Sequence, residues 1–165
     1  MNVFVLVGGW PGSGKSTLSR ALATELGIAC LAKDEIKDAL MDSLGAPETV
    51  TRSRELGVAA VHAVVRAARG CPGAVIDSTW YPYAFALVRE LPGQCVEVRC
   101  RVPVEVARQR YRRRVRDGRH LDGLRDEDEL WATEVAPLGV GPLIDVDNAG
   151  EVDIPALARR ILATP

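Results

Sequence analysis

The run from Gly9 to Ser16, with the sequence GWPGSGKS, matches a complete Walker A phosphate-binding loop. Its glycines let the backbone turn tightly enough to direct several N–H groups at one phosphate. A helix that starts here adds unpaired N–H groups and the positive end of its dipole. Lys15 can reach the β- and γ-phosphates of a nucleotide, and the Ser16 hydroxyl can bind Mg²⁺. We therefore predict a nucleotide-binding loop made of Gly9, Pro11, Gly12, Ser13, Gly14, Lys15, Ser16 and Thr17.

A carboxylate follows a second apolar run. Asp77 comes directly after Ala74–Ile76, which is typical of a Walker B aspartate. Ligands of an open parallel sheet bind at the carboxyl ends of the strands, so Asp77 could hold Mg²⁺ beside Ser16, directly or through water. The alternative is that Asp77 only caps the turn at Ser78–Thr79. The predicted metal ligands are Ser16 and Asp77.

Asp34 lies in the segment Lys33-Asp34-Glu35-Ile36-Lys37, just after a short apolar run. An aspartate is favoured in the first turn of a helix without any function. It could also accept the proton of an acceptor hydroxyl during phosphoryl transfer. Lys37 would share a helix face with Asp34 and could bind a polar or anionic group of that acceptor. We predict Asp34 as a catalytic base and both residues as acceptor contacts.

The segment from Arg99 to Arg119 holds nine arginines but only two acids. Most of these arginines are expected on a solvated helix face, with Val104, Ala107 and Tyr111 turned toward the sheet. Phosphoryl transfer nevertheless needs positive charge near the transferring group. We expect a lid around residues 112–126. The predicted catalytic cations are Lys15, Arg110 and Arg114, with Arg119 contacting the substrate.

Aromatic residues crowd the chain after Asp77. Trp80, Tyr81 and Tyr83 could stack on the ring of an acceptor, or they could pack beneath a helix. His120 lies in the expected lid, where it could contact substrate or remain an exposed polar residue. Trp80 and His120 are therefore further candidate substrate contacts, whereas His62, within an Ala/Val-rich helix, is expected to be structural.

Apolar runs alternate with helical patterns along the chain, which indicates βα units around a parallel sheet. The pattern predicts a single domain, 1–165, with a three-layer α/β/α P-loop NTPase fold similar to nucleoside-monophosphate kinases. The sheet is expected to have five mainly parallel strands. The expected strands cover 2–7, 28–31, 73–77, 95–100 and 143–146, and the expected helices cover 15–26, 34–44, 51–69, a segment starting near Pro103, and one carrying Ile154, Leu157 and Ile161.

Composition narrows the possible functions. The 165 residues carry a net charge of −1, so the whole molecule offers no strong field for nucleic acid. The three lysines are Lys15, Lys33 and Lys37, all at or near the candidate site. No apolar stretch approaches the ~20 residues of a membrane span, and no basic segment precedes the first apolar run. The four cysteines show no metal-ligand spacing. We expect a cytoplasmic protein with no membrane association.

Taken together, these motifs resemble the small P-loop kinases of the polynucleotide-kinase, zeta-toxin and chloramphenicol-phosphotransferase type (AAA_33-like kinases), with gluconate kinases as relatives. The segment Gly141–Asp147 is similar to the last strand of that family. The resemblance implies ATP and Mg²⁺ as cofactors, Asp34 as the base, Asp77 as the Walker B-like aspartate, and lid arginines closing over the phosphoryl group. The family often carries an asparagine two residues after this aspartate, where the present chain has Thr79.

Three functions fit this reading. The first is transfer of the ATP γ-phosphoryl group to a hydroxyl of a small-molecule acceptor. The second is a polynucleotide 5′-hydroxyl kinase, in which the arginines and aromatic residues would grip a short nucleic-acid end; the near-neutral charge speaks against it. The third is a nucleotide-dependent switch without catalysis, which would have no use for Asp34 and would require, for guanine, an Asn-Lys-x-Asp motif that the sequence lacks.

Overall fold

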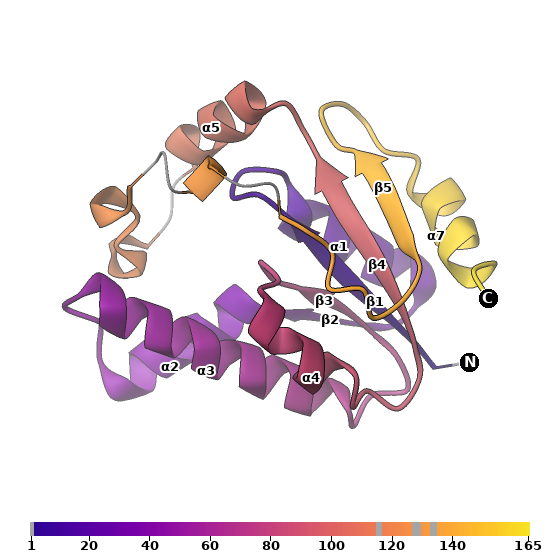
Figure 1. Cartoon of the computed structure of the whole chain (residues 1–165), viewed down its shortest axis with the longest axis horizontal. Helices are drawn as coiled ribbons and strands as arrows, with labels where there is room; N and C mark the ends of the chain where they lie inside the picture. The colour runs from indigo at the N-terminus through magenta and orange to yellow at the C-terminus, as the bar shows by residue number, and fades with distance from the viewer. Residues whose placement is uncertain (1, 115–116, 127–129, 133–134) are drawn as a thin grey trace.

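The computed structural model describes residues 2–114, 117–126, 130–132 and 135–165 (Figure 1). Five strands form one sheet in the order β2-β3-β1-β4-β5, and every pair is parallel. The strands are β1 (Val3–Gly9), β2 (Ala29–Ala32), β3 (Ala74–Asp77), β4 (Gln94–Arg101) and β5 (Leu143–Asp147). The helices are α1 (Lys15–Leu26), α2 (Lys33–Leu44), α3 (Val50–Ala68), α4 (Phe85–Val88), α5 (Val104–Arg113) and α7 (Ile154–Leu162), with short 3₁₀ turns at η1 (Pro82–Ala84), η2 (Gly118–His120) and η3 (Asp122–Leu124).

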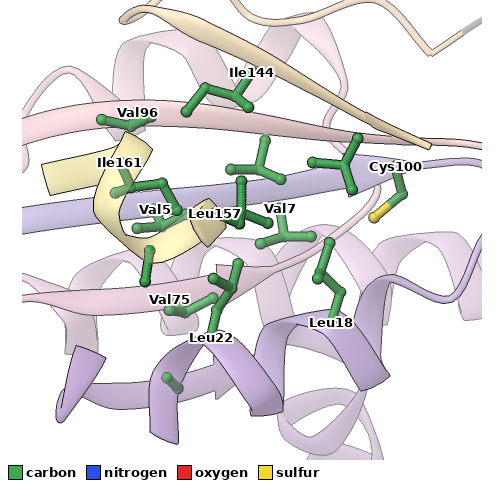
Figure 2. Packing of buried hydrophobic residues seen from close by; sticks show 14 of the residues in the cluster. Val5, Val7, Leu18, Leu22, Val75, Val96, Cys100, Ile144, Leu157 and Ile161 are labelled. Carbon is green, nitrogen blue, oxygen red and sulfur yellow. The ribbon is translucent and has the colours of Figure 1, made fainter. Parts of the chain in front are cut away.

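Helices cover both faces of the sheet, which explains why β1 is buried along its whole length. Side chains alternate between the two faces of a strand. Val5 and Val7 pack with Leu22 of α1 and Leu157 of α7 on one face (Figure 2). On the other face, Phe4 and Leu6 pack with α3 through Val61, Val64 and Val65. The predicted three-layer fold is confirmed, with a sheet that is entirely parallel.

The helix after β4 differs from the expectation in two ways. Pro103 precedes α5 as its N-cap residue, and α5 ends at Arg113, so that Arg114 is already in an extended conformation. The helix also does not rest on the sheet: Ala107 and Tyr111 pack with Val102 and Trp131 in a separate cluster. Its narrow apolar stripe is covered by Trp131 and by the phosphate loop rather than by the strands.

The half of the sheet formed by β4 and β5 is crossed by residues 135–142 (Figure 1). The carboxylate of Glu97, buried in β4, accepts hydrogen bonds from the backbone N–H groups of Leu138 at 2.6 Å and Val140 at 2.8 Å. This carboxylate holds the crossing segment in place. Among the described helices, none is long and apolar enough to span a membrane.

Candidate active site

The loop between β1 and α1 has the backbone geometry of a phosphate cradle. Gly12 and Gly14 adopt φ values of +79° and +86°, which side chains rarely tolerate. Gly14 is the N-cap residue of α1, and no described side chain caps this end of the helix. The first N–H groups of α1 and its positive dipole end therefore face the loop, as an anion site requires. Ser13 is fully buried within the loop, and Thr17 is exposed in the first turn of α1.

Lys15 lies at the start of α1 with its ammonium group folded back over the loop. Its Nζ donates to the carbonyl oxygen of Trp10 at 3.0 Å. Burial lowers the pKa of Lys15, and the nearby carboxylates of Asp77 and Asp34 oppose that shift. The ammonium group is thus within electrostatic range of both predicted carboxylates. A phosphate group in the loop would offer it a stronger partner than a neutral carbonyl.

Ser16 and Asp77 meet, as the sequence predicts. The Ser16 hydroxyl donates to Oδ2 of Asp77 at 2.5 Å. The contact follows from topology: Asp77 pairs with Val7 across neighbouring parallel strands, and α1 begins directly after the loop that follows β1. A hydroxyl and a carboxylate are hard oxygen donors of the kind Mg²⁺ prefers, and Mg²⁺ usually takes only one or two protein ligands besides phosphate and water. The described residues contain no cluster of three or more metal-binding side chains.

Asp34 lies in the first turn of α2, and the N-cap residue is Ala32. Ala32 pairs with Asp77 across β2 and β3, so Asp34 follows the same edge of the sheet two residues later. The Nζ of Lys33 lies 2.6 Å from Oδ1 of Asp34; the Asp34 side chain is about half exposed, although Oδ1 itself is buried. The structure therefore brings the predicted base to the same rim as Ser16 and Asp77. Its accessible position suits contact with a substrate hydroxyl.

Lys37 is placed differently from the prediction. Its side chain is buried between α2 and α3, and its Nζ donates to the Ser53 hydroxyl at 2.7 Å. The reason is helical geometry: Lys37 sits on the side of α2 that packs against α3, whereas Asp34 lies nearer the rim. The lysine thus supports the packing of the two helices, and its predicted contact with an acceptor remains a prediction.

The aromatic residues after β3 separate into two groups. Trp80 is buried against Gly8, and its Nε1 donates to the carbonyl oxygen of Val7 at 3.1 Å. This position fits the packing alternative, because the indole is enclosed in the apolar cluster with Phe4 and Leu6. Tyr81 and Tyr83 are exposed and stack on one another with ring centroids 6.3 Å apart.

Arg110 and Arg114 do not share a site. Arg110 donates from Nη1 to the carbonyl oxygen of Asn148 at 2.9 Å and from Nη2 to that of Ala149 at 3.0 Å, in the loop after β5. Arg114, beyond the end of α5, lies over the ring of Tyr111 and donates to Asp122 at 2.8 Å. The two arginines do not share a helix face, because α5 ends before Arg114.

Two residues that the sequence did not single out hold the phosphate loop. The side-chain amide of Asn148 donates to the carbonyl oxygen of Ser13 at 2.6 Å. The indole N–H of Trp131 donates to the carbonyl oxygen of Pro11 at 3.3 Å, and its ring meets Tyr111 edge to face. An asparagine just after the last strand was a usable signal for Asn148. No local pattern indicated Trp131.

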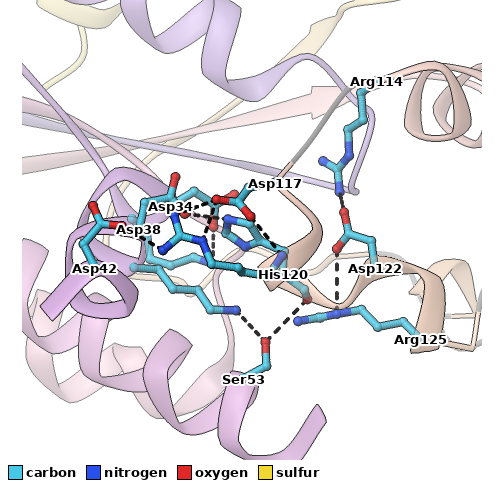
Figure 3. A network of polar contacts seen from close by, with 12 residues as sticks. Asp34, Asp38, Asp42, Ser53, Arg114, Asp117, His120, Asp122 and Arg125 are labelled. Carbon is cyan, nitrogen blue, oxygen red and sulfur yellow. Dashed lines mark hydrogen bonds and ion pairs between the residues drawn. The ribbon is translucent and has the colours of Figure 1, made fainter. Parts of the chain in front are cut away.

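The predicted lid lies partly outside the described residues, because positions 115–116 are not among them. Residues 117–124, which we call the lid segment, form η2 and η3 next to α2 (Figure 3). Arg119 donates to Asp42 at 2.7 Å and to Asp117 at 2.7 Å. The side-chain and backbone hydrogen bonds from Arg119 to Asp117 lower the pKa of Asp117 to about 2. His120 is buried, with Nε2 2.6 Å from Oδ1 of Asp38, so it is not an exposed polar residue.

A P-loop at the carboxyl edge of a parallel sheet, next to the Ser16–Asp77 pair, defines the small P-loop kinase fold. The chain belongs to the AAA_33 family, described as an AAA domain, whose family model matches residues 4–128. An uncharacterized protein of Mycobacterium tuberculosis is 31% identical over 161 residues. That match covers 88% of this chain, and the chain spans about a third (32%) of the length of that relative.

Solved structures support the same fold. A protein of Chloroflexus aurantiacus J-10-fl, provisionally assigned as a kinase, superimposes with a TM-score of 0.83 at 26% identity, covering 99% of this chain and 98% of its own. A gluconokinase of Sinorhizobium meliloti 1021 gives 0.61 at 20% identity, covering 98% and 89%. The APS kinase of Mycobacterium tuberculosis gives 0.62 at 19% identity, covering 98% and 95%. The last two likenesses concern the fold alone.

Proposed function

We propose that this protein is a Mg-ATP-dependent kinase that transfers the γ-phosphoryl group to a hydroxyl of a small-molecule acceptor. The observation that carries the proposal is the convergence of Lys15, the Ser16–Asp77 pair and Asp34 on one edge of the sheet. A nucleotide switch would use Lys15, Ser16 and Asp77 but would have no use for the half-exposed Asp34 side chain in the first turn of α2. The kinase names of the gluconokinase and APS kinase structures agree with this class of reaction.

Each residue has a defined task in the proposed reaction. The acceptor oxygen bonds to the γ-phosphorus while the bond from that phosphorus to the leaving ADP oxygen breaks, and Asp34 receives the proton of the acceptor hydroxyl. Lys15 leaves the Trp10 carbonyl and binds the phosphate oxygens. Ser16 and Asp77 would hold Mg²⁺, which supplies positive charge to the phosphates when it is bound.

We assign Arg110 to the nucleotide end of the site rather than to the transferring phosphoryl group. Two of its N–H groups are engaged by carbonyl oxygens of the loop after β5, and that loop also holds Ser13 through Asn148. A guanidinium fixed in this way presents its flat face for stacking on a base. The lid arginines, Arg114 and Arg119, remain candidates for contact with the phosphoryl group or the acceptor.

The test is transfer of labelled γ-phosphate from Mg-ATP to a panel of acceptors, with the wild type beside Asp34→Asn. The panel contains sugars, nucleosides, aminoglycosides, chloramphenicol-like alcohols and 5′-hydroxyl oligonucleotides. We expect labelling of one small-molecule class and a fall of ~10²-fold or more in Asp34→Asn, because the acceptor proton has no base. ATP affinity should be unchanged in the variant.

The matched control is Glu35→Gln, which removes a neighbouring carboxylate that forms an exposed ion pair with Arg20. It should leave transfer within about twofold of the wild type. If labelling appeared only on oligonucleotide ends, the acceptor class would be wrong. If nucleotide bound but no acceptor was labelled, and slow ATP hydrolysis was indifferent to Asp34, the switch would replace the kinase.

A further inference from the structure

Three aspartates form one stripe along α2. Asp34, Asp38 and Asp42 follow each other at intervals of four residues, so they lie on the same face of the helix. The proposed base, Asp34, is at the end of the stripe next to β2. The other two carboxylates are not needed for the proposed chemistry, and both contact the lid segment (Figure 3).

The two contacts differ in character. Arg119 bridges Asp42 and Asp117 at the surface, and its side chain is 34% exposed. His120 is 2% exposed, and its Nε2 lies 2.6 Å from the Asp38 carboxylate. The exposed bridge is the weaker of the two, because water and salt screen it. The His120–Asp38 contact is the costlier one to break, since the enclosed imidazole would lose its partner, although the Asp38 side chain itself is 40% exposed.

A third contact joins the lid segment to α3. The buried amine of Lys37 donates to the Ser53 hydroxyl of α3, and that hydroxyl lies 3.5 Å from the carbonyl oxygen of His120. His120 is therefore held by its ring to α2 and by its backbone near α3. Nothing in a short surface turn would require burial of this kind unless the turn were docked in a defined position.

We propose that Asp38 and Asp42 are positioning residues that dock the lid segment on α2, so that the helix carrying the base also fixes the cover of the site. The docking itself is independent of any reaction, and its effect on catalysis rests on the proposed function. A lid held in place excludes water from the phosphoryl group. When it opens, a water oxygen can bond to the γ-phosphorus as the ADP oxygen leaves, giving phosphate and a proton to solvent in place of the phosphorylated acceptor.

The docking can be measured without any substrate, because the lid segment is followed by a trypsin site at Arg125–Asp126. We compare the rate of cleavage at that bond, identified by mass spectrometry, in the wild type, Asp42→Asn and Asp38→Asn. Cleavage should accelerate about two- to fivefold in Asp42→Asn, which loses an exposed ion pair. It should accelerate more strongly, about tenfold, in Asp38→Asn, which weakens the partner of an enclosed imidazole.

Matched variants separate docking from general damage to α2. Glu35→Gln, on the same helix but paired with Arg20, should cleave at the wild-type rate. Asp42→Glu should restore most of the protection. Asp42→Asn should have no further effect in an Arg119→Gln background, because the two residues act through one contact. Equal cleavage of Asp38→Asn, Asp42→Asn and Glu35→Gln would overturn the docking.

The effect of docking on catalysis is measured as the ratio of acceptor phosphorylation to ATP hydrolysis. The ratio should fall severalfold in Asp38→Asn and Asp42→Asn, while the KM for ATP stays near the wild-type value. Faster cleavage with an unchanged ratio would reduce these contacts to a structural role and overturn the positioning claim. If no acceptor is ever phosphorylated, the proposed function fails, and the cleavage rates still decide the docking.

Discussion

At the scale of single residues, the site is defined by groups whose surroundings change their chemistry. Cys100, at the end of β4, is an example outside the reaction. Burial raises the pKa of this thiol to about 12, against an ordinary value of 9.0. The nearby Lys15 ammonium lowers the pKa and Asp77 raises it, but both effects are smaller than that of burial. Cys100 is therefore a neutral, enclosed thiol, whereas Cys30 of β2 is exposed.

This difference predicts selective alkylation. Only the thiolate is a strong nucleophile, so at pH 8 about one Cys100 side chain in ten thousand would be reactive even if the reagent reached it. We expect iodoacetamide to modify Cys30 in the native protein and to modify Cys100 only under unfolding conditions, as read by peptide mass spectrometry. Native-state modification of Cys100 at a rate similar to Cys30 would contradict its described burial.

Some of the residue contacts in the candidate site could be predicted from the sequence, and others could not. The adjacency of Ser16 and Asp77 could be predicted, because a loop motif and a strand-ending acid on neighbouring parallel strands must meet. The burial of Lys37 against Ser53 could not, because helical spacing from Asp34 does not say where α3 packs. The partner of His120 lies 82 positions away in the chain. No local pattern encodes a contact over that separation.

At the scale of elements, the phosphate loop is confined by α5. An added Cβ at Gly12 would overlap the carbonyl oxygen of Ala107, and Gly12 also has a positive φ. We expect Gly12→Ala to displace the loop from α5 and to weaken nucleotide binding by at least tenfold, measured by titration calorimetry. Strain at a positive φ of this kind costs on the order of 1–2 kcal/mol before any clash is counted.

A second glycine provides the control. Gly57 lies within α3, and nothing approaches within 4 Å of an added Cβ there. Gly57→Ala should stabilise the protein by ~0.5–1 kcal/mol in chemical denaturation, because alanine loses less backbone entropy in a helix. Nucleotide affinity should stay at the wild-type value. If both variants behaved alike, close packing of α5 on the loop would not be the cause of the Gly12 effect.

Element boundaries were largely predictable for the same physical reasons. Gly27 ends α1 in the left-handed conformation, as expected for a glycine after the last apolar residue of the helix. The end of α5 was not predictable in this way. Arginines favour helices, and the reason the chain leaves the helix at Arg114 is tertiary: its guanidinium lies over Tyr111 and pairs with Asp122.

At the scale of the whole molecule, one buried carboxylate holds the part of the chain that returns from the lid to the last strand. Replacing Glu97 by alanine would leave the N–H groups of Leu138 and Val140 without their acceptor. We expect the free energy of unfolding to fall by roughly 2–4 kcal/mol with an unchanged denaturant m-value. Glu90→Ala, which removes an exposed pair with Arg69, should cost less than about 1 kcal/mol. Equal losses would contradict the anchoring role of Glu97.

The three-layer architecture itself was accessible from the alternation of apolar runs and helical patterns, since parallel strands buried on both faces leave few other arrangements. The position of the crossing segment 135–142 could not be predicted from the sequence, because this segment has neither helical nor strand periodicity. Its position depends on Glu97, a carboxylate that is buried within β4. A buried charge of this kind is a signal that a partner must exist, although it does not say which one.

The chain has three tryptophans, and all of them touch the phosphate loop or the strand that leads into it. Trp10 lies within the loop and receives the Lys15 ammonium on its carbonyl oxygen, Trp80 donates to Val7, and Trp131 donates to Pro11. Intrinsic tryptophan emission therefore reports almost entirely on this one region. A nucleotide that drew Lys15 away would change that signal directly, so ligand screening needs neither a dye nor an identified acceptor.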